Sequence, residues 1–113
     1  MKLFKVWLVA VDEMTQVSNG RWKVHTTMAA RTRESDDVAI FLSKRSAKAF
    51  LKKMFGDIDK QLRESENIKF KSGKYTYDIG RSYDPRYSWL FEDTDTGETQ
   101  SLQLSLVRDY VDI

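Results

Sequence analysis

The sequence contains no cysteine and only one histidine, His25, and these two shortages exclude several classes of site. Without cysteine there can be no disulfide and no thiolate zinc site, and nothing in the chain requires an oxidising compartment. With one histidine, a multi-histidine metal centre cannot be assembled. His25 stands on the polar side of an expected strand, so we interpret it as a surface residue. We therefore expect neither a metal nor a cofactor.

Long apolar runs are also missing. The longest run near the start, Val6 to Val11, is bounded by Lys5 and Asp12 and is far too short to span a bilayer. Lys5 also interrupts the apolar stretch that a signal peptide would need, and no small-residue cleavage pattern follows. We interpret this segment as a strand. We expect the protein to be cytoplasmic and its partners not to include a membrane.

Recognisable catalytic motifs are absent as well. The chain has no phosphate-binding glycine loop and no nucleotide fingerprint, and its carboxylates fall mainly in expected loops, turns and polar helix positions. The segment Glu92–Glu98 is rich in carboxylates, but its spacing does not match a calcium-binding EF-hand loop, so we interpret it as a hairpin turn. We expect the protein not to be an enzyme, although the sequence leaves a small hydrolase or nuclease open.

What the chain does contain is the composition of one globular domain. It has 113 residues, of which 41% are hydrophobic and 32% charged. This length can bury roughly two-thirds of the unfolded surface, which is enough for a single core. We therefore assign residues 1–113 to one domain, with no internal repeat or linker.

One segment, Ser43 to Ser65, has the clearest periodicity. Its apolar residues follow the i, i+3, i+4, i+7 spacing of a single helix face, and they are Ala47, Phe50, Leu51, Met54, Phe55, Ile58 and Leu62. We predict one helix that continues through Gly56, begins at a cap on Ser43 or Ser46, and buries Leu51 and Phe55 fully.

The rest of the chain favours strands. Alternating apolar residues predict strands at 2–12 and 21–30, joined as a hairpin after a polar loop at 12–20, and a short strand at Val38–Leu42. After the helix, we predict a strand broken or turned at Ser72-Gly73, a strand around residues 87–92 and a final strand around residues 102–106. The predicted fold class is α+β: a mostly antiparallel sheet in the order β-β-β-α-β-β-β, with the amphipathic helix packed on one face.

The charges are distributed unevenly. Residues 1–56 hold 11 Lys or Arg and 5 Asp or Glu, whereas residues 57–113 hold 8 and 12. In the expected helix, Arg45, Lys48 and Lys52 follow i, i+3, i+7 spacing and should line one ridge, with Lys44 and Lys53 beside it. Such a ridge can bind phosphates or an acidic protein, and it can equally be a solvated helix face.

A group of aromatic residues and arginines forms the second candidate surface. Aromatic rings beside arginines can stack on nucleic-acid bases, and both residue types are enriched at protein interfaces. The same alternation also suits packing within a sheet. The group consists of Tyr75, Tyr77, Arg81, Tyr83, Arg86, Tyr87 and Trp89.

These patterns predict a non-catalytic interaction module. Our first hypothesis is a protein that binds a protein partner through the aromatic–arginine group and the basic helix face. Inhibition of that partner, and acidic groups on its surface, are options that the sequence leaves open. The alternative is a nucleic-acid-binding protein that uses the basic helix at 44–53 and the strand aromatics. The sequence leaves the oligomeric state open.

Overall fold

The computed structural model describes residues 3–32, 34–77 and 85–112, and for residues 75–77, 85 and 112 it describes the backbone alone. In these residues, five strands and one long helix follow each other along the chain. They are β1 (Leu3–Gln16), β2 (Trp22–Ala29), α1 (Lys44–Glu64), β3 (Ile68–Tyr77), β4 (Pro85–Asp93) and β5 (Thr99–Asp112), with a 3-10 turn, η1 (Ser18–Gly20), between β1 and β2.

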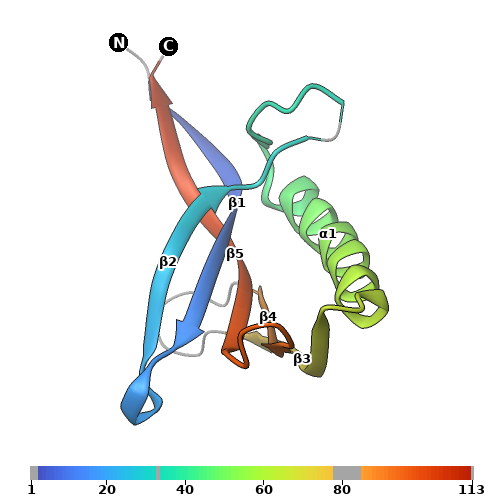
Figure 1. Cartoon of the computed structure of the whole chain (residues 1–113). Coiled ribbons are helices and arrows are strands. Elements are labelled where there is room, and N and C mark those ends of the chain that lie inside the picture. Colours follow the sequence, from blue (N-terminus) through green and yellow to red (C-terminus); the bar gives the residue numbers. More distant parts are fainter. Residues whose placement is uncertain (1–2, 33, 78–84, 113) are drawn as a thin grey trace.

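The strands form one antiparallel sheet in the order β2-β1-β5-β4-β3, and α1 lies across one of its faces (Figure 1). The first and last strands are therefore neighbours, and the two chain termini lie together at one end of the sheet. This arrangement confirms the predicted α+β class, the antiparallel sheet and the position of the helix.

The first strand is longer than predicted. We expected a polar loop from residue 12 to residue 20, but β1 continues to Gln16, because Asp12 to Gln16 pair with β2 and Asp12 to Thr15 also pair with β5. Polar side chains are tolerated here because backbone pairing on both sides satisfies the peptide groups. The register with β2 shifts by one residue between Glu13 and Met14, where β2 carries the extra residue His25, and the turn itself is confined to the residues around η1.

The predicted strand at Val38–Leu42 is wrong. This segment makes only isolated bridges, Arg31 with Val38 and Trp7 with Phe41. Its partners change within a few residues, since the Ala39 amide donates to Ala30 whereas the Phe41 amide donates to Trp7. Because the chain crosses from the end of β2 to β1, no ladder can form.

Helix α1 begins where a serine caps it. The Ser43 Oγ accepts a hydrogen bond from the Ser46 amide at 3.1 Å, which identifies Ser43 as the N-cap residue. The helix runs through Gly56 as one element, as predicted. Ala47, Leu51 and Leu62 are buried, but Phe55 is only partly buried, so the expectation of full burial holds for Leu51 and is wrong for Phe55.

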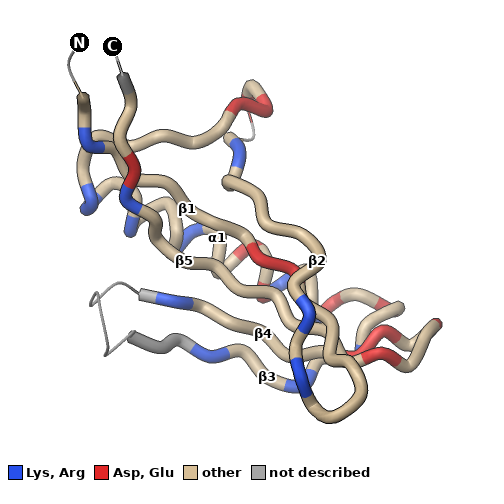
Figure 2. Tube along the Cα trace, turned by 90° about the vertical axis from the view of Figure 1, so that its left-hand side faces the viewer, with Lys and Arg blue, Asp and Glu red and all other residues tan. Residues whose placement is uncertain are grey.

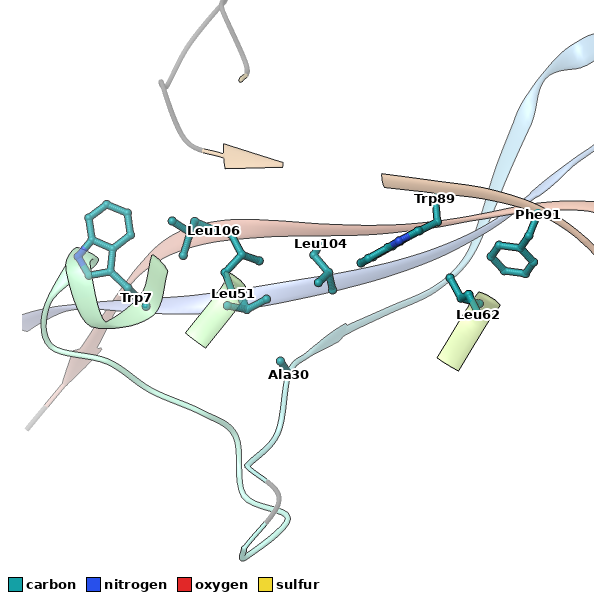
Figure 3. Packing of buried hydrophobic residues seen from close by; sticks show 10 residues of the cluster. Trp7, Ala30, Leu51, Leu62, Trp89, Phe91, Leu104 and Leu106 are labelled. Atoms are coloured by element: carbon teal, nitrogen blue, oxygen red, sulfur yellow. The ribbon is translucent and has the colours of Figure 1, made fainter. Parts of the chain in front are cut away.

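The core lies between α1 and the sheet. Its largest fully buried side chains are Trp89, Leu51, Leu104 and Val9. Figure 3 shows the core as an elongated layer, with Trp7, Leu106 and Leu51 toward one end and Trp89, Phe91 and Leu62 toward the other. Each end thus has a tryptophan that fills the space between helix and strands.

The predicted break at Ser72-Gly73 is a continuous part of β3 that carries a bulge between Phe70 and Ser72. Gly73 is there for a different reason: a Cβ at this position would lie 3.0 Å from the Trp89 ring. The missing side chain lets the Trp89 indole reach α1, where its Nε1 donates to Asp59 Oδ1 at 3.1 Å. The second oxygen of Asp59 accepts from Arg63 at 2.9 Å, which is an i, i+4 ion pair within α1.

Candidate interaction surface

The basic ridge, which we define as Arg45, Lys48 and Lys52, lies on the first half of α1, and all three side chains are exposed. The residues occupy one flank of the helix because their spacing of three and four positions returns to the same side. Opposite charges on the sheet do not neutralise them, since the ion pairs found among the described residues lie elsewhere in the fold.

The ridge is electrostatically unfavourable for the helix that carries it. Lys44, Arg45, Lys48 and Lys52 place like charges three and four positions apart, which destabilises a helix. The first turn also contains no acidic residue, although the partial positive charge of a helix N-terminus favours one. Within the helix, therefore, the charges of Arg45, Lys48 and Lys52 oppose folding.

An aromatic stack borders the ridge on the side of the sheet. The Phe55 ring lies 4.3 Å from the Tyr87 ring and 5.4 Å from the Trp89 ring, centroid to centroid, both in stacked geometry. Tyr87 is half-buried, whereas Trp89 is 1% exposed. Trp89 therefore belongs to the core and cannot contact a partner, so we remove it from the candidate surface.

The rest of the predicted aromatic–arginine group is only partly described. Arg86 is exposed on β4, and by strand alternation it projects from the sheet face opposite to Tyr87. The backbone of Tyr75 pairs with that of Tyr87, and the backbone of Tyr77 with that of Pro85, while their side chains lie outside the description. Arg81 and Tyr83 lie outside the described residues.

The cations of the ridge continue onto the sheet, which sequence reasoning missed. The Lys44 ammonium lies 5.1 Å from the centre of the Trp7 ring. Arg108 pairs with Trp7 across β1 and β5, and Lys5 precedes Trp7 by two residues, so both project from the helix-covered face of the sheet. Figure 2 shows several Lys and Arg segments near this end with one Asp or Glu segment among them, and further carboxylates at the far end.

The opposite flank of α1 is chemically different. A groove of about 510 Å³ runs between α1 and residues 31–41, with an apolar floor formed by Phe41, Phe50, Met54 and Ile58. Its rim carries both signs of charge, including Arg31 and Lys53 beside Glu34 and Asp57. The groove explains why part of the apolar stripe remains half-exposed.

The acidic turn and the histidine lie where the sequence placed them. Asp93 Oδ1 accepts from the amide of Asp95 at 2.9 Å, and Gly97 adopts a φ of 74°, which is ordinary turn geometry. Among the described residues, no three His, Asp or Glu side chains come together as a metal-binding group. His25 is exposed on the edge strand β2, 4.0 Å from Glu13.

Comparison with protein-family models, curated proteins and solved structures finds no match to this chain. Within the described part of the chain, no helix is both long enough and apolar enough to cross a membrane. The chemistry of the surface is therefore the basis for a functional proposal.

Proposed function

We propose that the protein is a non-catalytic module that binds an acidic protein partner in the cytoplasm through the basic ridge of α1. The observation that supports this most strongly is the series of like charges in the first half of the helix. Sequences normally avoid such local conflict, and where it persists it is expected at functional sites. An acidic partner would relieve the repulsion between these cations. The repulsion in the free helix therefore adds to the free energy gained on binding.

The aromatic residues favour a protein partner over nucleic acid. Base stacking needs exposed ring faces, but Trp89 is in the core and Tyr87 is stacked on Phe55. A half-buried tyrosine beside a row of cations suits the edge of a protein interface, where aromatic residues and arginines are enriched. The bound module would cover the partner's surface and so prevent other molecules from reaching it, which is the way in which it would inhibit the partner.

Nucleic acid remains the second candidate, because a row of cations along one helix also suits a row of phosphates. The two candidates differ in their dependence on salt. Binding through phosphates loses affinity with a log–log slope of about −0.9 for each contact, so the three ridge residues predict a slope near −2.7 on duplex DNA. A protein interface with an apolar centre should depend less steeply on salt.

The test compares two triple variants with equal changes of charge. Arg45→Glu/Lys48→Glu/Lys52→Glu reverses the ridge, and Lys23→Glu/Lys60→Glu/Lys69→Glu reverses three exposed lysines elsewhere. Both variants and the wild type are used to capture partners from cell lysate, with and without nuclease treatment, followed by cross-linking and mass spectrometry. We expect the wild type and the control to retain one acidic protein that the ridge variant loses.

Equal capture by the ridge variant would contradict the proposal, and capture that disappears after nuclease treatment would support nucleic acid instead. The aromatic–arginine group is tested separately by Tyr83→Ala, which should weaken binding by at least about 1–2 kcal/mol if this residue anchors the interface. Trp89→Ala is unsuitable for this purpose, because it would remove a core side chain.

A further inference from the structure

Large apolar side chains are exposed at the end of the molecule that carries both termini (Figure 1). Leu42 is 79% exposed and Leu3 is 68% exposed, values that are high for leucine. Four further residues at this end are at least 39% exposed, and with the two leucines they form what we call the apolar end: Leu3, Phe4, Ile40, Leu42, Val107 and Tyr110.

The sheet topology brings these residues together from three parts of the sequence. Among the described residues, β2 pairs with β1 only from Ala10 onward and β4 pairs with β5 only as far as Ser105, so residues 3–9 and 106–112 continue there as a two-stranded ribbon. In this ribbon Leu8 pairs with Val107. The bridge between Trp7 and Phe41 then holds residues 40–42 alongside it.

The same end carries a group of cations. Lys5 pairs with Tyr110, Arg108 pairs with Trp7, and Lys44 lies over the Trp7 ring. Lys5 and Arg108 are exposed, and the basic ridge begins at the next residue after Lys44. By strand alternation Lys5 and Arg108 project from the opposite face of the ribbon to Phe4 and Val107, so the cations and the protruding apolar side chains share this end of the molecule, together with the exposed Asp109.

We propose that this end binds the surface of an anionic lipid bilayer. Leu3, Leu42 and Phe4 would enter the boundary between headgroups and acyl chains, while Lys5 and Arg108 would contact lipid phosphates. Tyrosine is enriched at this depth of a bilayer, which suits Tyr110. The mode is contact from one side and involves no spanning segment, and it departs from our expectation from the sequence that the partners do not include a membrane.

The shape of the apolar end favours lipid over a protein surface. Its most exposed side chains project from a narrow two-stranded ribbon and from the segment before α1. A fluid bilayer adapts to such projections, whereas a protein partner would need a matching pocket for each. The proposal uses residues outside the basic ridge and does not depend on the protein partner proposed above.

The experiment is flotation of the full chain with vesicles of phosphatidylcholine alone or mixed with phosphatidylglycerol. We expect binding to the mixed vesicles at low salt, little binding to the neutral ones, and release at high salt. Leu42→Ser should weaken partitioning roughly tenfold, because one aliphatic anchor is lost. Lys5→Glu/Arg108→Glu should weaken it at least about 25-fold, since each nearby cation is worth about fivefold.

Matched controls change the same residue types at the other end of the sheet or at its far edge. Val17→Ser removes an exposed apolar side chain near η1, and Lys23→Glu/Lys69→Glu reverses two exposed lysines, so both should partition like the wild type. The proposal is overturned if the wild type does not float with anionic vesicles, or if Leu42→Ser and the control variants bind equally. It is also overturned if sedimentation shows a dimer that Leu42→Ser dissociates, because a second copy would then cover the apolar end.

Discussion

The substitution Lys48→Glu should stabilise the free protein while it damages the proposed interface. Lys48 has Lys44 four positions before it, Arg45 three positions before it and Lys52 four positions after it, all of the same sign. Glutamate at this position would turn three repulsive pairs into attractive ones. Its order relative to Lys52 is also the favourable one, with the acidic residue nearer the N-terminus.

The magnitude follows from the number of pairs. A like-charge pair costs about 0.2–0.5 kcal/mol and an opposite pair gains about as much, so three converted pairs give roughly 1–3 kcal/mol at low salt. Exposed pairs usually yield the lower part of such a range, and we therefore expect about 1 kcal/mol. For a domain of this size the melting temperature should rise by about 3–6 °C.

The assay is urea unfolding and thermal melting at low salt and at about 1 M salt, where the Debye length falls to about 3 Å and the gain should largely vanish. Lys60→Glu is the matched control on the same helix. Two of the three charged neighbours of Lys60 are the carboxylates of Asp57 and Glu64, so this change should be neutral or destabilising. If Lys48→Glu lowers the stability, or if both variants behave alike, the argument from like-charge repulsion fails.

Three further predictions concern the fold. Gly56→Ala should stabilise α1 by up to about 1 kcal/mol, because alanine has the higher helix propensity and nothing lies within 4 Å of the added methyl group. Gly73→Ala should destabilise the protein, because its methyl group would push the Trp89 ring from its place. Equal effects of the two substitutions in urea unfolding would contradict this. Leu51→Ala should lower the free energy of unfolding by about 4 kcal/mol, and Phe55→Ala, at a half-buried position, by about 2 kcal/mol. A larger loss for Phe55→Ala would show that Phe55 is more deeply buried than Leu51. Calorimetric titration with calcium should detect no tight site at the β4–β5 turn, and a chelator should leave the melting temperature unchanged.

The features that the sequence predicted well are those set by local periodicity. The apolar spacing of Ser43–Ser65 specifies one face of a helix, and the structure contains α1 with that face on the sheet. The alternating residues of 21–30 likewise predict a strand paired with β1, and β2 occupies this place. The basic ridge belongs to the same class, because helical spacing alone brings its three cations together.

The features that it missed depend on contacts between distant segments. Whether residues 12–16 form a loop or a strand is decided by pairing with β5, which lies almost 90 residues later in the chain. Gly73 resembles a turn residue in the sequence, but its role depends on Trp89 from the next strand and Asp59 from the helix. Trp89 itself alternates like a surface aromatic and is buried only because α1 covers that row of the sheet.

The two proposed surfaces illustrate this difference in their physical origin. The charges of the ridge repel each other in the isolated helix as in the folded protein, so the conflict is present before any tertiary structure forms. Exposure of Leu3, Leu42 and Val107 carries no such signal, because apolar residues in strand-like segments are ordinarily buried by the fold. The pairing of β1 with β5 beyond the described ends of their neighbours leaves Leu3 and Val107 uncovered, the bridge between Trp7 and Phe41 holds Leu42 alongside, and Lys5 and Arg108 belong to the same ribbon. The apolar end, with its nearby cations, therefore exists only in the assembled sheet. Its ligand has to be sought with the folded protein.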